Sequence, residues 1–219
     1  MNGVKAWSYS AYALYKQCPL KYKLTKIDKL KEPQSKAMAR GNAIHKKCED
    51  YLVSTQEIPV PKEALTFRPQ MEQLKGLDPF VEQKWGFTNQ WDATKGFFGK
   101  DVWLRVICDA GVIYPDNTAD VVDFKTGKLY DTNEEQIELF ANAVMFRYDH
   151  ITHVTARLWY LDSGDEIIRE FSRTERDKVR EKWEKQIYPM FTEEVFAPRP
   201  NNFCKWCHFR KDNGGPCPY

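Results

Sequence analysis

The sequence predicts an α/β or α+β fold in which one sheet is flanked by helices. Segments rich in β-branched and aromatic residues are grouped in the middle of the chain and again after residue 152. Segments with helical spacing of apolar residues precede, separate and follow these groups. The chain has 219 residues and a mass of 25.8 kDa, which fits one large domain with small additions better than two full domains.

Helices are expected where apolar residues recur at helical spacing and polar residues favour capping. Ser8 or Ser10 is the expected N-cap of the first helix. Asn133 is the expected N-cap of the third, which places Gln136 at its third position. Prolines 59, 61 and 69 allow at most short helices in the region that they occupy. The expected helices cover residues 8–17, 35–54, 133–148 and 174–192.

Strands are expected where period-two alternation or short apolar runs are bounded by turn residues. The last two are joined by residues 162–165 and form an expected hairpin. The expected strands cover residues 80–87, 102–107, 110–114, 119–124, 153–161 and 166–171. The predicted parts of a single domain are an N-terminal helical part (7–75), a core sheet (78–172), a C-terminal helix (173–195) and a Cys-rich tail (197–219).

Composition excludes several classes of protein. Lys and Arg number 33 against 31 Asp and Glu, and aromatics make up 14% of residues, so the chain is not a disordered acidic or basic one. No apolar run approaches the roughly 20 residues of a membrane helix, and the N-terminus lacks a signal-peptide pattern. Six cysteines are too few for a disulfide framework. An intracellular, cytoplasmic protein without a membrane partner is expected.

Residues 16–47 carry ten Lys or Arg and only two acidic residues. Tyr22 and Leu24 lie among these cations, and Tyr15 directly precedes them. Cations suit the phosphates of a nucleic acid and aromatic rings suit its bases. A solvated surface with counter-charges elsewhere in the fold explains the same stretch. By itself this stretch leaves both interpretations open.

Asp109 follows one apolar run, and Asp123 and Lys125 lie near the end of another. Side chains two apart on a strand point the same way, so Asp123 and Lys125 share a face. Adjacent strands would bring Asp109 to them. Two carboxylates at a sheet edge suit Mg²⁺, and a lysine beside them can orient water or neutralise developing charge. An ordinary surface ion pair next to a Thr-Gly turn is the alternative.

The order of short motifs along the chain is more specific than any one of them. A helix carrying Gly41-Asn-Ala-Ile-His45 comes first, then Asp109, then Asp123-Phe-Lys125-Thr-Gly-Lys, and then a helix with Gln136 and Phe140. In this order the chain resembles the PD-(D/E)XK nuclease superfamily, in particular its RecB-like exonuclease branch, which includes CRISPR-associated and phage exonucleases. Phe140 stands where that branch usually has tyrosine.

The resemblance implies a central mixed sheet of the restriction-endonuclease-like type and a role for each matched residue. His45, Asp109, Asp123 and the carbonyl of Phe124 would bind Mg²⁺ or Mn²⁺. Lys125 would be the catalytic lysine, and Gln136 would position Lys125 or the DNA. Glu82, on the strand before Asp109, is a further acidic candidate. The implied catalytic set is Asp109, Asp123, Lys125 and Gln136.

Three cysteines in the Pro- and Gly-rich tail contribute little to a core, which favours a metal site there. RecB-like nucleases of the CRISPR-associated and AddB kinds hold a [4Fe–4S] cluster with one early and three late cysteines. The resemblance therefore implies a cluster on Cys18, Cys204, Cys207 and Cys217. Zn²⁺ on the same cysteines, or on three of them with His208, is the alternative. Cys48 and Cys108 fall in apolar patterns and are expected in the core.

The function implied is that of a metal-dependent DNA nuclease, most readily an exonuclease acting on linear DNA in recombination, repair or phage or CRISPR DNA processing. Its expected partners are single-stranded DNA or duplex ends, and a separate helicase, annealing protein or integrase. The alternatives are a non-catalytic DNA-binding module and a zinc-tail interaction protein on a nuclease-like scaffold. Cleavage polarity, strand preference and oligomeric state are left open by the sequence.

Overall fold

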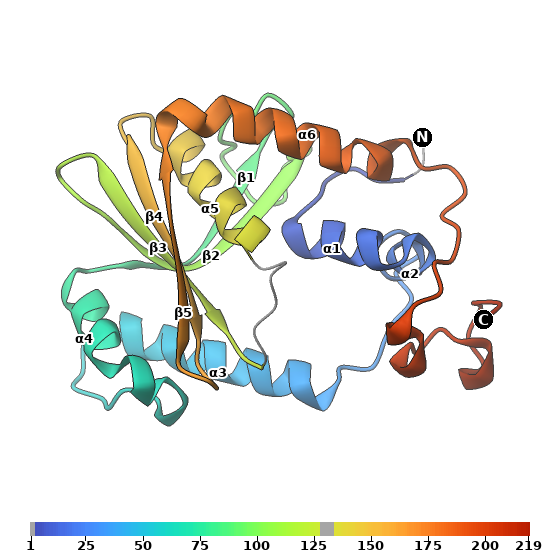
Figure 1. Ribbon diagram of the computed structural model, residues 1–219, viewed down its shortest axis with the longest axis horizontal. Helices are drawn as coiled ribbons and strands as arrows, with labels where there is room; N and C mark the ends of the chain where they lie inside the picture. The colour runs from blue at the N-terminus through green and yellow to red at the C-terminus, as the bar shows by residue number, and fades with distance from the viewer. Residues whose placement is uncertain (1–2, 128–133) are drawn as a thin grey trace. The chain divides into compact units, whose positions relative to one another are not determined.

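The computed structural model describes residues 3–127 and 134–219. The chain divides into two compact units, one formed by residues 36–180 and the other by residues 1–35 together with 181–219. The first unit holds the sheet and the helices on its two faces (Figure 1). The second combines both ends of the chain. No helix among the described residues is long and apolar enough to cross a membrane.

The sheet has five strands in the order β1-β2-β3-β4-β5. Strands β3 and β4 are parallel, and the other neighbours are antiparallel, so the sheet is mixed as expected. The parallel step is made by α5, the helix that crosses between β3 and β4. The strands are β1 (Phe80–Phe87), β2 (Leu104–Ile113), β3 (Thr118–Lys125), β4 (His153–Tyr160) and β5 (Asp165–Ser172).

Helices cover both faces of this sheet (Figure 1). Helix α3 (Lys36–Val53) and helix α4 (Arg68–Gly76) pack on one face, and α5 (Glu134–Arg147) packs on the other. A 3₁₀ segment, η2 (Lys62–Phe67), leads into α4. The core beneath α3 and α4 contains Cys48, which is buried as predicted, and Phe67 stacked on Trp159 at 5.1 Å between ring centroids.

Two expected strands, residues 102–107 and 110–114, are in fact parts of the single strand β2. The prediction was wrong because it took Asp109 as a break between apolar runs. Strand β1 pairs with Cys108 and Ala110 on either side of Asp109, so the backbone stays extended. Asp109 accepts a hydrogen bond from the backbone N–H of Phe124, which satisfies a buried carboxylate inside a strand.

The second unit is built from α1, α2 and the chain's C-terminal part. Ser8, and not Ser10, caps α1 by accepting a hydrogen bond from the Ala11 N–H at 3.3 Å. Helix α6 begins in the sheet unit and ends in this one. The predicted N-cap of α5, Asn133, lies outside the described residues. The remaining elements are α1 (Tyr9–Gln17), α2 (Pro19–Tyr22), π-helical η1 (Lys23–Ile27), α6 (Arg176–Thr192) and the 3₁₀ turns η4 (Arg173–Glu175), η5 (Asn202–Trp206) and η6 (Lys211–Asn213).

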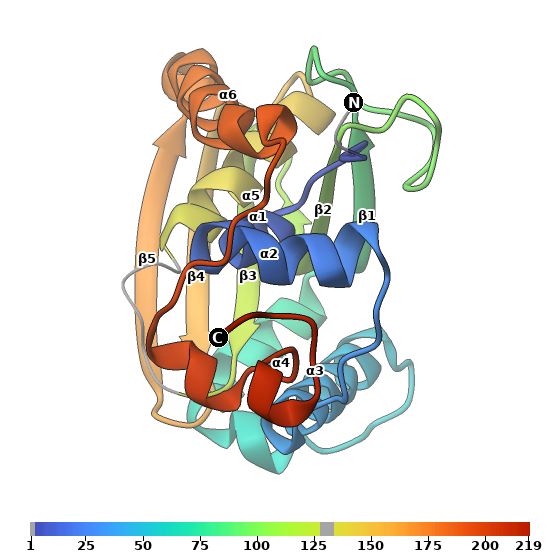
Figure 2. The ribbon, with the colours of Figure 1, turned by 90° about the vertical axis from the view of Figure 1, so that its right-hand side faces the viewer.

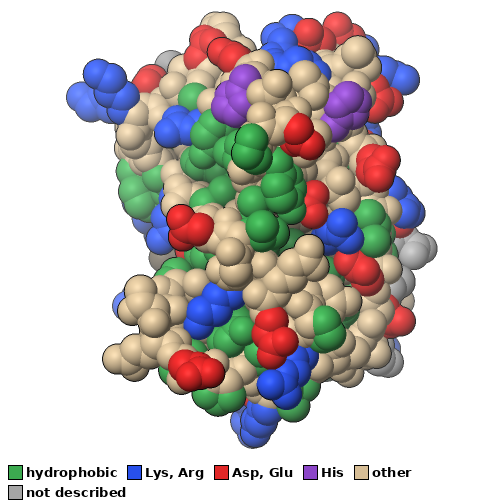
Figure 3. Space-filling view, turned by 90° about the vertical axis from the view of Figure 1, so that its left-hand side faces the viewer, with side chains coloured by type: hydrophobic (Ala, Val, Ile, Leu, Met, Phe, Trp, Pro, Cys, Tyr) green, Lys and Arg blue, Asp and Glu red, His purple; other side chains and the backbone are tan. Residues whose placement is uncertain are grey.

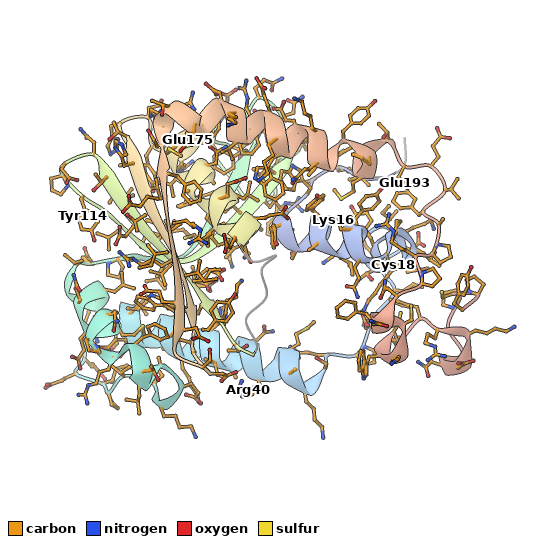
Figure 4. The ribbon with its side chains drawn as sticks, in the orientation of Figure 1. Lys16, Cys18, Arg40, Tyr114, Glu175 and Glu193 are labelled. Carbon is orange, nitrogen blue, oxygen red and sulfur yellow. The ribbon has the colours of Figure 1, made fainter. Side chains whose placement is uncertain are left out.

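The end of the sheet unit that carries the β2–β3 turn is mostly apolar at its centre (Figure 3). Tyr114, labelled in Figure 4, directly follows β2 there, and together with Leu74 and Leu77 of the α4 region it lines a cavity of about 130 Å³. Asp120 and Arg157, which form an ion pair at 3.4 Å, are also part of the lining. None of the predicted catalytic residues lines this cavity.

Candidate active site

The predicted catalytic residues come together within the sheet unit, although they lie on four different elements. His45 is on α3, Asp109 on β2, Asp123 and Lys125 on β3, and Gln136 in the first turn of α5. Strands β2 and β3 pair antiparallel up to Ala110 and Val122, which places Asp109 and Asp123 next to each other. The site therefore sits where β2 and β3 stop pairing.

Alternation along β3 sets the first part of the site. Asp123 and Lys125 are two residues apart, and their side chains form an ion pair with 2.5 Å between Lys125 Nζ and Asp123 Oδ2. Lys125 Nζ also donates to Gln136 Oε1 at 2.7 Å, and Gln136 Nε2 donates to Asp123 Oδ1 at 3.1 Å. The amide of Gln136 thus bridges the carboxylate and the ammonium group and fixes both.

His45 and Asp109 form the second part. His45 Nδ1 lies 3.3 Å from Asp109 Oδ2, and that same oxygen accepts the N–H of Phe124 at 2.8 Å. The backbone of Phe124 is therefore placed between the two aspartates. Gly41, one turn before His45, permits a close approach: a Cβ there would lie 3.0 Å from Thr126 Oγ1. Glycine at this position lets α3 approach the end of β3.

Glu82, the further acidic candidate from the sequence, belongs to the same cluster. One ligand atom each from His45, Glu82 and Asp109 lie within 4.8 Å of one another, and among the described residues no other three such groups do so. Glu82 faces Asp109 across the β1–β2 ladder, with a left-handed backbone (φ 48°). That conformation costs roughly 1–2 kcal/mol for a residue other than glycine. Backbone strain of this kind is common at functional sites.

Burial and like charge make this site electrostatically unfavourable without a cation. Asp123 is 3% exposed and Asp109 8%. Burial, with the charge of Asp109, raises the pKa of Asp123 to about 6 despite the neighbouring Lys125. Burial, together with the charges of Asp109 and Glu49, also raises the pKa of Glu82. Carboxylate oxygens and an imidazole nitrogen in this arrangement fit a divalent cation.

The raised pKa of Asp123 predicts how stability depends on pH. The folded-state pKa of Asp123 lies above the unfolded value of 3.8, so the folded state favours the protonated carboxyl. The contribution of this group to the free energy of unfolding is therefore complete below pH 4 and is lost as the pH rises through about 6. Asp123→Asn removes the titrating charge. In EDTA this variant should therefore melt about 5 °C above wild type at pH 8 and at the wild-type temperature at pH 4.

Thermal melting in both buffers measures this effect, with Asp149→Asn as the control, because the Asp149 side chain is 95% exposed. A variant that is destabilised at pH 8 would mean that the Lys125 ion pair outweighs burial and repulsion at this site.

The four cysteines predicted as cluster ligands also come together, within the second unit. Cys18 lies at the C-terminal end of α1 (Figure 4) and, with the three tail cysteines, lines a cavity of about 140 Å³. Asn201 Nδ2 donates to the carbonyl of Gln17 at 2.9 Å, which fastens the tail beside Cys18. The cavity is lined by all four predicted ligands: Cys18, Cys204, Cys207 and Cys217.

The sulfur atoms surround this cavity instead of closing on one point. The N–H groups of Arg199 and Asn201 donate to the sulfurs of Cys18 and Cys204 at 3.5 and 3.3 Å. No three cysteine sulfurs among the described residues lie within 4.8 Å of one another. Cys48 and Cys108 are fully buried, and burial raises the pKa of both thiols, as expected of core residues.

The sequence matches the family model of the PD-(D/E)XK nuclease superfamily over residues 6–211. The chain belongs to this superfamily. The match spans nearly the whole chain, including both the sheet unit and most of the Cys-rich tail. It confirms the resemblance drawn from the motif order, and the mixed sheet flanked by helices confirms the expected fold class. No curated protein matches the sequence.

Two solved structures are similar to this chain. A presumed exonuclease of Eubacterium rectale superposes with a TM-score of 0.51 at 13% sequence identity, over 95% of this chain and 89% of that protein. The protein designated SSO0001 gives a TM-score of 0.47 at 14% identity, over 98% of this chain and 86% of its own. At this sequence identity, the similarity to the Eubacterium rectale protein shows the fold alone.

Proposed function

We propose that the protein is a divalent-metal-dependent nuclease that hydrolyses phosphodiester bonds of DNA, acting as an exonuclease on linear molecules. One observation carries this proposal. Asp109 and Asp123 are buried side by side, with His45 and Glu82 on one side and Lys125 on the other. Membership of the nuclease superfamily indicates which chemistry this arrangement serves. A scaffold without catalytic activity would have no chemical need for Asp109, Asp123 and Lys125 together.

Mg²⁺ or Mn²⁺ would be held by His45, Glu82, Asp109, Asp123 and the carbonyl of Phe124. Such an ion lowers the pKa of a coordinated water and neutralises charge on the phosphate. Lys125 is held by Gln136 beside the carboxylates, where its ammonium group can orient the attacking water and stabilise charge that develops on the phosphate oxygens. The burial of the carboxylates strengthens both effects.

The proposal is tested by incubating the protein with end-labelled linear duplex, circular duplex and single-stranded DNA in Mg²⁺, in Mn²⁺ and in EDTA. We expect release of short products from linear DNA with either metal and none in EDTA. Cleavage of circular duplex at the same rate would replace exonuclease with endonuclease action. Full activity in excess chelator would contradict the metal mechanism, and no activity on any substrate would favour a non-catalytic DNA-binding role.

Manganese should support cleavage at least as well as magnesium. His45 offers a nitrogen ligand, which Mn²⁺ accepts more readily than Mg²⁺ does. Initial rates at matched concentrations of the two metals measure this preference. In His45→Asn, which keeps a polar ligand but removes the imidazole, the advantage of Mn²⁺ should shrink. An unchanged Mn²⁺ to Mg²⁺ rate ratio in this variant would place His45 outside the metal site.

We also propose that the four cysteines hold one [4Fe–4S] cluster. In tetrahedral zinc the sulfurs approach one another to about 3.8 Å, given Zn–S bonds of about 2.3 Å. The cysteines here are spread around a cavity, which favours a larger group. Backbone N–H groups that point at the sulfurs suit the thiolates of such a cluster. The cluster would be structural and would tie Cys18 to the C-terminal tail.

A further inference from the structure

The connection between β1 and β2 is a long loop, residues 88–103, that projects from the sheet unit beside β1 (Figure 2). Its base is well anchored. Trp91 is fully buried, and the Thr94 N–H donates to the carbonyl of Gly86 at 2.9 Å. Thr94 Oγ1 donates in turn to the carbonyl of Gly96 at 2.8 Å. These contacts anchor the base of the loop as far as Gly96.

The tip presents two adjacent phenylalanines. Phe98 is 79% exposed, the largest exposed fraction among the large hydrophobic residues that the structure describes. Its ring meets that of Phe97 edge to face at 4.8 Å. The Arg105 guanidinium lies 5.8 and 5.2 Å from the two ring centroids, and Arg105 Nε donates to the carbonyl of Phe97 at 3.1 Å. These contacts hold an aromatic side chain in solvent, where it contributes nothing to the core.

Strand alternation connects this tip to the proposed metal site. Leu104, Val106 and Cys108 are buried, so Arg105, Ile107 and Asp109 occupy the other face of this part of β2. Ile107 is 40% exposed, and its partner across the ladder, Lys84, is also exposed. Cross-strand partners share a face. This strip runs from the buried Asp109 and half-buried Glu82, through the exposed Lys84 and Ile107, to the half-buried Arg105 and the exposed Phe98.

The spacing of this strip suits an extended polynucleotide strand. Successive same-face positions on a strand are about 7 Å apart, and Arg105 is about 14 Å along β2 from Asp109. Lys84 and Arg105 thus offer cations one and two steps from the metal site. Lys95 and Lys100 flank the two phenylalanines, although Asp92 and Asp101 lie in the same loop. Cations beside an exposed ring are the features that bind single strands.

We propose that one unpaired DNA strand lies along this strip, with phosphates at Lys84 and Arg105 and a base stacked on Phe98. This inference rests on the proposed nuclease function and adds the path and the single-stranded state of the substrate near the cut. Phe98 would be a positioning residue: it holds the strand two to three nucleotides from the scissile phosphate. A protein partner at the loop tip is the alternative outcome of the test.

The test measures binding without cleavage. Anisotropy of a labelled oligo(dT) strand is recorded in EDTA for wild type, Phe98→Ala, Phe98→Leu and Phe98→Trp. Loss of one stacked base should weaken binding about tenfold in the alanine and leucine variants, and tryptophan should keep wild-type affinity. Leu65→Ala is the matched control, because Leu65 is 51% exposed on η2 and should bind as wild type.

Two further readouts separate stacking from a general effect. A 2-aminopurine placed two or three nucleotides from the cleaved bond should be quenched by wild type and not by Phe98→Ala. Lys84→Gln should reduce the slope of log affinity against log salt by about 0.7, the effect of one lost phosphate contact on a single strand.

The outcomes distinguish this inference from the proposed function. Wild-type affinity in Phe98→Ala or in Phe98→Leu, in a protein that cleaves DNA with Mg²⁺, overturns the inference and leaves the nuclease function standing. Equal weakening by Leu65→Ala also overturns it. Wild-type protein that neither binds DNA in EDTA nor cuts it with metal fails the proposed function itself, and the inference fails with it.

Discussion

Alanine at Asp109, Asp123 or Lys125 is expected to abolish DNA cleavage while leaving DNA binding largely intact. The two aspartates would hold the proposed metal, so the loss of either would remove one of its ligands. Lys125 would stabilise charge that develops only in the transition state, so its loss should lower the single-turnover rate by about 10² to 10³. DNA binding is expected to depend on phosphate contacts elsewhere on the protein, such as those of the basic residues within 16–47.

Single-turnover cleavage of linear DNA, paired with binding in EDTA, separates the two effects for each variant. Asp149→Ala is the control for the aspartates, since its side chain is 95% exposed. Gln136→Ala should give a smaller loss than Lys125→Ala, because Gln136 acts through the lysine and the carboxylate that it bridges. Cleavage at wild-type rates in all three alanine variants would show that the site is wrongly placed.

Alanine at Cys18 or Cys207 is expected to give unstable or insoluble protein. The proposed cluster on these residues would close a loop that extends from α1 to the end of the chain. By the reasoning that applies to disulfides, closing a loop of this length stabilises the folded state by about 5 kcal/mol. Few apolar side chains of the tail are buried: Phe209 is buried, but Phe203 and Trp206 are 61% and 75% exposed.

Yield, thermal melting and iron content of protein purified without oxygen measure this effect. Wild type should be brown, with iron and labile sulfide at four each per chain if one [4Fe–4S] cluster is present. Cys48→Ala is the matched control: it alters a buried cysteine outside the cavity and should keep its iron. Colourless protein with one zinc per chain would replace the cluster with zinc, and stable protein without either metal would contradict both.

The parts of the site that depend on local periodicity could be predicted from the sequence. Asp123 and Lys125 share a face because strand side chains alternate, and the distance of 2.5 Å between their charged groups agrees. Ser8 was a candidate cap from its residue type alone. Each of these properties is set within a few residues of chain, where sequence patterns are most informative.

The exact strand register and the local backbone conformation could not be predicted from the sequence. Glu82 meets Asp109 only because β1 pairs with β2 in one register and because its backbone is left-handed. A glutamate in an otherwise β-like segment carries no mark of either property. The prediction of a break between strands at Asp109 fails because the stabilising contact is distant in the sequence. The buried carboxylate is tolerated inside the strand because it accepts a hydrogen bond from the Phe124 N–H, a partner 15 residues away.

If His45, Glu82, Asp109 and Asp123 form a metal site, phosphodiester cleavage must depend on a bound divalent metal. The most direct measurement is the single-turnover rate of linear DNA cleavage as Mn²⁺ is titrated into metal-free protein, for wild type and for Asp109→Asn. We expect a rate that rises from zero to saturation in wild type, with a strongly weakened or absent response in Asp109→Asn. Cleavage without added metal, or the same Mn²⁺ dependence in both proteins, would contradict it.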